Sequence, residues 1–206
     1  MRSFAHPIAF VAALVAVSVS APPAARAGEG GGGWKKAKSK AGVVIYTREK
    51  EGSQYLEVKG TGTVDATPDE VFAFLSDMGN YKKLSPSLKE AKDLGSCGEG
   101  CRYIYERVGQ WPVTDRHWVF EQRVVEKGEG SWVFSWKVSG KKKPEGEGAI
   151  AVTEHTGSWT VSPADGKTRV VYRNHIEMGG DIPVDFVNNG SVKGALDFYI
   201  NLRKSI

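Results

Sequence analysis

The alternation of apolar and polar positions predicts a chain made mostly of β-strands. Residues two apart in a strand share one face of a sheet, whereas helical neighbours recur at spacings of three and four. Segments rich in Val, Ile, Tyr, Trp and Thr, separated by Gly, Pro and Asp turns, predict strands at 43–49, 55–65, 88–95, 101–108, 115–126, 131–138, 149–162 and 168–177. Asp165-Gly166 is a strong hairpin signal, and strands joined by such turns pair antiparallel.

Two segments carry a helical pattern instead. The first begins with Thr67 as N-cap, Pro68 at the first helical position and Glu70 completing a capping box. A further helical turn is predicted at 81–84. The second helix is predicted at 184–203, although its asparagines and glycines weaken the pattern. Strands, two helices, six further strands and one long closing helix predict one α+β domain without internal repeats.

A curved antiparallel sheet capped by a long C-terminal helix builds an internal apolar cavity. The alternation predicts a concave face that is aromatic but also polar. The residues expected to bind a ligand there are Tyr103, Tyr105, Trp118, Phe120, Gln122, Phe134, Trp136, Tyr172, Asn174 and Ile176, with Val187 and Phe198 of the closing helix above them. An apolar pocket with a few placed polar groups describes a small-molecule site. An ordinary aromatic core is the alternative interpretation.

Residues 1–27 have the pattern of a secretory signal peptide. Arg2 precedes an apolar region at 8–19, and Ala25-Arg26-Ala27 is a small-x-small cleavage site. Cleavage near Ala27 predicts a periplasmic or secreted protein. A retained membrane anchor is the alternative, but the apolar region is short and no stop-transfer pattern follows. Cleavage lowers the net charge from +4 to +2, because two arginines and no acidic residue are lost, so we expect no nucleic-acid partner.

Cys97 and Cys101 flank the turn Gly98-Glu99-Gly100 and are the only two cysteines of the chain. An oxidising compartment favours a disulfide between them. For so short a loop, the chain-entropy estimate gives about 2 kcal/mol of stabilisation. A redox or metal pair is the alternative, but no CxxC dithiol and no second Cys/His pair is present.

Residues 28–41 are predicted to be a flexible leader that precedes the domain at 42–206. The glycines at 28–33 match GxGxxG literally, but no strand precedes them and no helix follows, so the motif does not predict a nucleotide site. Lys35, Lys36, Lys38 and Lys40 then suggest the solvated face of a short helix. Attraction to an anionic membrane surface is the alternative.

No catalytic or metal-binding constellation stands out. His117 and His175 fall on strand faces expected to be exposed, and neither HxH nor HExxH spacing occurs, so we assign no metal site and no catalytic residue. Glu106 and Glu121 lie on neighbouring strands. Paired catalytic acids are one interpretation, and exposed cross-strand partners of arginines are the favoured one.

Six short patterns, in order over most of the chain, resemble the START (StAR-related lipid-transfer) family of the helix-grip/SRPBCC superfamily. They are Trp34 with Gly42–Arg48; Gly60–Phe72; Tyr81–Pro86; Trp111–Val119; Gly157-x-Trp159 with Thr168-x-Val170-x-Tyr172; and Gly179-Gly180-x-Ile182-Pro183. The chain departs from the family where Leu84 replaces a usual Trp and His117 a usual acid. Gln122 stands near the place of a family arginine, so the acid–arginine pair of some members is not recognised.

The resemblance implies a helix-grip fold that holds one lipid or sterol-like ligand beneath the C-terminal helix, with no cofactor. We therefore expect an exported, monomeric lipid-binding or lipid-transfer protein that makes transient contact with anionic membrane. A pocket enzyme of the cyclase or hydrolase kind and a sensor of small apolar molecules are the alternatives. The resemblance also places the lysine-rich loop at 139–148 over the pocket mouth as a membrane-docking lid; a solvated hairpin loop is the competing interpretation.

Overall fold

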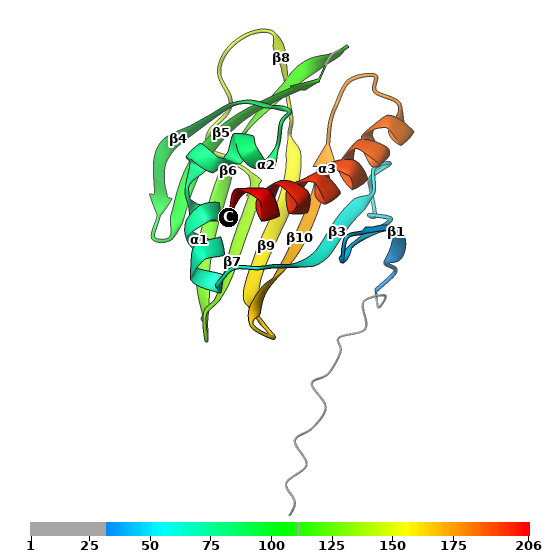
Figure 1. Ribbon diagram of the computed structural model, residues 1–206. Helices are drawn as coiled ribbons and strands as arrows, with labels where there is room; N and C mark the ends of the chain where they lie inside the picture. The colour runs from blue at the N-terminus through cyan, green and yellow to red at the C-terminus, as the bar shows by residue number, and fades with distance from the viewer. Residues whose placement is uncertain (1–31, 111) are drawn as a thin grey trace, which may run out of the picture.

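The computed structural model describes residues 32–206 except Trp111, and it shows a ten-stranded sheet wrapped around a long C-terminal helix (Figure 1). The strands are β1 (Lys35–Lys40), β2 (Val43–Arg48), β3 (Glu57–Val64), β4 (Leu88–Gly98), β5 (Cys101–Gln110), β6 (Val113–Gly128), β7 (Ser131–Val138), β8 (Ala149–Ala151), β9 (Glu154–Ala164) and β10 (Lys167–Glu177). The helices are α1 (Pro68–Ser76), the 3-10 turn η1 (Met78–Asn80), α2 (Tyr81–Leu84) and α3 (Val184–Ser205).

The strand order is β1-β2-β3-β10-β9-β7-β6-β5-β4, with β8 pairing β6 off this path. All described pairs are antiparallel except β8 with β6. Figure 1 shows α3 lying across the concave side of the sheet, with α1 and α2 near its C-terminal end. The predicted α+β helix-grip fold is confirmed.

Helix α3 is fixed to the sheet by Tyr199, which is completely buried. Its hydroxyl lies 2.7 Å from the carbonyl oxygen of Gly60 and 2.8 Å from that of Val170, and it accepts a hydrogen bond from the backbone N–H of Tyr172. A Cβ atom at Gly60 would lie 2.6 Å from the Tyr199 ring, so glycine is needed for this close approach. The hydroxyl therefore joins α3 to β3 and β10 at one point.

Helix α1 begins where the sequence predicts. Thr67 accepts a hydrogen bond from the backbone N–H of Glu70, and the Glu70 carboxylate accepts one from the backbone N–H of Thr67, which closes the capping box. Pro68 occupies the first helical turn. These local contacts aim Val71 and Leu75 into the core, where both are completely buried.

The basic segment Lys35–Lys40 is a β-strand, so the prediction of a short helix there is wrong. It pairs with β2 as an exposed edge strand, with a bulge between Lys36 and Lys38. Lysines and a bulge discourage an edge strand from pairing with other chains, which explains this composition in a strand. The domain boundaries at 27 and 41 stay predictions, and residues 1–27 lie outside the described residues.

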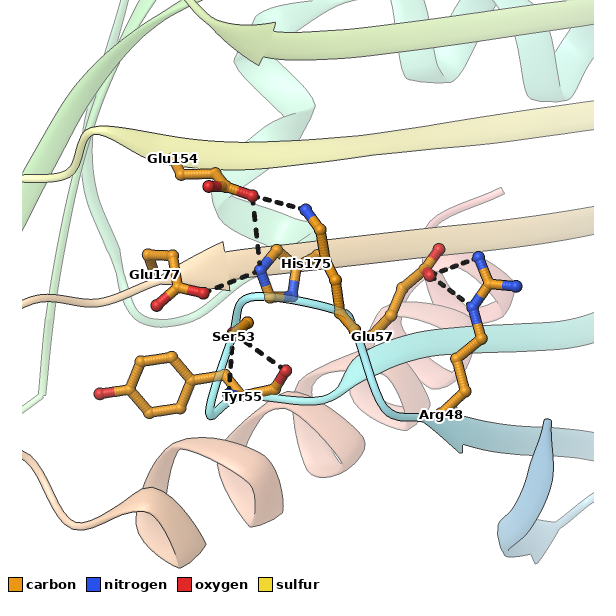
Figure 2. A network of polar contacts seen from close by, with 8 residues as sticks. Arg48, Ser53, Tyr55, Glu57, Glu154, His175 and Glu177 are labelled. Carbon is orange, nitrogen blue, oxygen red and sulfur yellow. Dashed lines mark hydrogen bonds and ion pairs between the residues drawn. The ribbon is translucent and has the colours of Figure 1, made fainter. Parts of the chain in front are cut away.

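His117 and His175 are buried, which corrects the prediction that both face solvent. Strand β8 pairs with β6 at His117, whose ring also lies edge-on to Tyr105. Figure 2 shows His175 in a polar network, where its Nε2 lies 3.1 Å from Glu177 and 3.7 Å from Glu154. Alternation predicts on which face of the sheet a side chain lies. It does not predict whether other segments cover that face and bury the side chain. No helix of the described chain is both long and apolar enough to cross a membrane.

Cys97 and Cys101 form a disulfide at the turn between β4 and β5, with Cα atoms 5.1 Å apart. The bridge closes a loop only four residues apart in sequence and lies at the end of a hairpin. Its removal therefore releases little chain entropy. The disulfide fits an oxidising compartment.

We expect the double variant Cys97→Ser/Cys101→Ser to keep its fold and lose about 2 kcal/mol of stability at most, because the bridge constrains only its own turn. Chemical denaturation of the parent and the variant measures the difference. Cooperative unfolding lost in the variant would contradict a purely local role.

Candidate functional site

A cavity of about 790 Å³ lies between the concave face of the sheet and α3. Its size is that of pockets that hold small organic ligands. Its walls come from α2, the turn that follows it, β4–β7, β9, β10 and α3. The lining residues on the sheet are Leu88, Glu106, Val108, Gly109, Trp118, Phe120, Gln122, Trp136, His155, Trp159, Tyr172 and Asn174.

Aromatic rings form the apolar part of the wall. Phe198 of α3 stacks on Trp159 and on Tyr172, with ring centroids 5.6 and 5.2 Å apart. Trp136 lies against β9 at Gly157, where a Cβ atom would come within 2.3 Å of the indole. These contacts hold flat ring surfaces against the cavity.

The structure brings together seven of the twelve predicted ligand-binding residues in the lining of this cavity. They are Trp118, Phe120, Gln122, Trp136, Tyr172, Asn174 and Phe198. Phe134 is completely buried in the core between Phe72 and Trp159. Ile176 and Val187 are also buried and do not line the cavity. Contact of any of these side chains with a ligand stays a prediction.

Strand β5 presents the opposite face from the one predicted. Glu106 pairs with Trp118 and Ile104 with Phe120 across β5 and β6, so their side chains share the concave face. Tyr103 and Tyr105 therefore point to the convex side, where Tyr105 contacts His117. Their prediction as concave-face residues is wrong, and so is that of Glu106 as an exposed partner of an arginine.

Glu106 is the only acidic side chain that β5–β10 contribute to the described lining. It is half-buried, and the space it faces is the cavity. Burial raises the pKa of its carboxyl from the usual 4.5 to about 7. The Trp118 indole beside it lowers this pKa only in part, and its Nε1 makes no hydrogen bond of normal geometry. Glu106 thus changes its charge near neutral pH.

A second polar position is Gln122, which is buried under α2. Its amide nitrogen donates to the Tyr81 hydroxyl at 3.1 Å, and Arg102 Nη2 approaches its carbonyl oxygen at 3.5 Å. Arg102 does not line the cavity and also donates to the backbone carbonyl of Ser76. Gln122 is therefore held in one orientation from both sides.

The third polar position is the pair His155 and Asn174. His155 Nε2 lies 2.8 Å from Asn174 Oδ1, and burial lowers the pKa of the imidazole to about 4. The ring is therefore neutral at physiological pH, and its Nε2–H donates to the asparagine. The sequence analysis did not identify His155, Trp159 and Tyr81 as cavity residues. The alternation along β9 puts His155 and Trp159 on one face and could have identified these two.

The loop at 139–148 contributes no residue to the cavity lining, which corrects its expected place over the mouth. Lys142 donates to the backbone carbonyl of Leu94 and lies over the Tyr103 ring, on the convex side of β5. The lining residues that are exposed belong instead to the turn Ser85–Ser87 and to the face of α3 that carries Gly190 and Gly194, so we take the mouth to lie between these two segments. A role of the loop lysines at a membrane stays a prediction.

We expect Glu106→Gln to become more stable relative to the parent as pH rises from 4.5 to 7. The folded parent binds a proton that the unfolded chain releases in this window, because the folded pKa is the higher one. The parent therefore loses stability there, and glutamine does not titrate. Denaturant unfolding at pH 5 and pH 8 measures the difference. Glu126→Gln, at the exposed end of β6, is the matched control. Equal pH dependence of all three proteins would contradict the burial of this carboxyl.

The fold and the cavity define a helix-grip domain of the START type. The chain matches the family described as polyketide cyclase / dehydrase and lipid transport over residues 55–198, and it belongs to that family. It is 29% identical over 174 residues to an uncharacterized protein of Pseudomonas aeruginosa, covering 84% of this chain and 86% of the relative.

Two solved structures share the architecture. One is a STAR-related lipid transfer protein from Xanthomonas axonopodis, 26% identical, with a TM-score of 0.75 over 84% of this chain and 97% of that one. The other is human StAR-related lipid transfer protein 5, 19% identical, with a TM-score of 0.76 over 84% and 86% of the two chains. The resemblance seen in the sequence is thereby confirmed at the level of family and fold.

Proposed function

We propose that the protein binds one hydrophobic ligand, a lipid or sterol-like molecule, in the cavity beneath α3 and carries it between membranes. The observation that supports this most is the cavity itself, which is about 790 Å³ in volume and has an apolar wall made largely of aromatic side chains. A family that includes lipid transport and a STAR-related lipid transfer protein of the same fold support it further.

The energetics suit retention of an alkyl chain. Each buried CH₂ contributes about 0.8 kcal/mol, so a chain of ordinary lipid length is held firmly once it leaves water. The disulfide supports an exported location, and export with cleavage near Ala27 is part of the proposal. Transfer then takes place outside the cytoplasm by a monomer that visits anionic membrane surfaces.

A pocket enzyme is the second candidate, favoured by one observation. Glu106 has a pKa of about 7 inside the cavity, which suits a general acid or base at neutral pH. The family description also includes cyclases and dehydrases. A binding role is the stronger proposal, because the neutral His155 is engaged with Asn174 and no second titrating group of the described lining lies beside Glu106 in hydrogen-bond contact.

Native mass spectrometry of protein purified from its own host, followed by lipid extraction, tests the two candidates. We expect one lipid per chain, released intact, and vesicle-to-vesicle transfer of that lipid by the delipidated protein. Conversion of the extracted lipid during incubation would favour the enzyme. Protein that carries no lipid and takes none up from vesicles would reject the binding function.

A further inference from the structure

We propose that the cavity selects ligands by head-group charge: it takes an uncharged head group that donates hydrogen bonds, such as a hydroxyl or amide, and rejects carboxylate and phosphate head groups. Glu106 is the specificity-determining residue. This inference rests on the proposed binding function and names the ligand class.

No free cation among the described lining residues is available to neutralise an anionic head group. Lys193 is the one lysine or arginine there; it is exposed at the rim and forms an ion pair with Asp197 one helical turn away. Arg102 is not among the lining residues; it donates to Ser76, lies 3.7 Å from Asp93 and approaches the cavity only through Gln122, whose Oε1 is 3.5 Å from its Nη2. A buried anion with no cation beside it is strongly disfavoured.

Glu106 adds repulsion to this lack of cations. The other titratable groups that line the cavity are the phenols Tyr81 and Tyr172, the neutral His155, and the rim pair Lys193–Asp197. Burial raises the pKa of both phenols, so neither is charged near pH 7, and none of these groups offsets a carboxylate at Glu106. The repulsion of an anionic ligand therefore grows as pH rises through 7.

An uncharged donor satisfies the same carboxyl in both of its protonation states. The ionised form accepts a hydrogen bond from a hydroxyl or amide N–H, and the protonated form can donate to the same hydroxyl or to an amide carbonyl. Gln122 on β6 and Asn174 on β10 also line the cavity, and as neutral amides they add no charge of their own. The polar side chains of the sheet wall are thus matched to a neutral, hydrogen-bonding head group.

Competition binding with four single-chain amphiphiles of equal length tests the proposal: a long-chain alcohol, its primary amide, its carboxylate and its alkylammonium. Each displaces a bound fluorescent fatty alcohol from the delipidated protein at pH 6 and pH 8, below the critical micelle concentration. For the parent at pH 8, we expect the alcohol and amide to bind at least about tenfold more tightly than the carboxylate, because two like charges share a low-dielectric site. At pH 6 the difference in affinity between the carboxylate and the uncharged probes becomes smaller, because Glu106 is then mostly protonated.

Glu106→Gln should remove most of this discrimination by improving carboxylate binding, while alcohol binding changes less than about threefold because the glutamine oxygen still accepts. Glu126→Gln should bind like the parent, and melting curves confirm that all three proteins are folded. The proposal would be overturned if the parent bound the carboxylate and the alcohol equally well. It would also be overturned if the ratio of the two affinities were the same in Glu106→Gln as in the parent. An alkylammonium that binds far more tightly than the alcohol would overturn it as well. Binding of no probe, the fluorescent alcohol included, would instead reject the proposed function.

Discussion

Replacing Tyr199 by alanine is expected to lower the free energy of unfolding by about 3–5 kcal/mol, among the largest effects of any single change in this chain. Tyr199 is completely buried in α3, and its ring fills the space left by the glycines of β3. Alanine would leave a cavity there and remove the hydroxyl that bridges Gly60 and Val170 to the helix. Urea unfolding followed by circular dichroism measures the loss.

Tyr199→Phe separates the two contributions. Phenylalanine keeps the ring but leaves buried backbone groups of β3 and β10 without their partner, which costs about 1–3 kcal/mol. The alanine variant should therefore be clearly less stable than the phenylalanine variant. A phenylalanine variant as stable as the parent would show that water or strand contacts satisfy these backbone groups.

Much of the fold is predictable from the sequence because its signals are local. The capping box at Thr67, the Asp165-Gly166 turn and the alternation of β6 and β10 depend on neighbours close in the chain, and the structure has all of them. Such local agreement is typical of natural sequences. The long helix α3 is also predictable, although Gly190 and Gly194 weaken its pattern, because its packing residues recur with helical spacing.

The face of β5 could not be predicted, because its two faces look alike. Tyr103 and Tyr105 are apolar enough to suit a concave wall, and the other face mixes Ile104 and Val108 with charged residues. Only the pairing register with β6 decides, since it puts Glu106 opposite Trp118. Register is a non-local property, so the candidate site missed its most informative polar residue.

Burial of polar side chains was the other limit. His117 and His175 alternate as outward residues should, yet β8 and the acidic neighbours of β9 and β10 enclose them. The lysines of Lys35–Lys40 led to the wrong prediction of a helix. A lysine-rich segment suits a solvated helix and a protected sheet edge equally well, and the structure shows an edge strand. What lies over a surface depends on the whole fold and cannot be read from period alone.

Replacing Gly194 by tryptophan should obstruct the mouth of the cavity without unfolding the protein. Gly194 lines the cavity on an exposed face of α3, and a Cβ atom there meets nothing within 4 Å. Glycine is also a poor residue inside a helix, so alanine there removes a cost of about 1 kcal/mol and tryptophan removes part of it. Val187 is less suited to this test, because it is buried away from the lining.

We expect Gly194→Trp to melt at the parent's temperature or above and to take up ligand at least about tenfold more slowly, which corresponds to a barrier about 1.4 kcal/mol higher. Gly194→Ala is the matched control: its gain in helix propensity is at least as large, it adds only a methyl group, and it should exchange ligand like the parent. Stopped-flow uptake of a fluorescent lipid and thermal melts on the same samples measure both effects. A tryptophan ring at this position should hinder passage through the mouth. If the variant folds and still takes up lipid at the parent's rate, the ligand enters the cavity elsewhere.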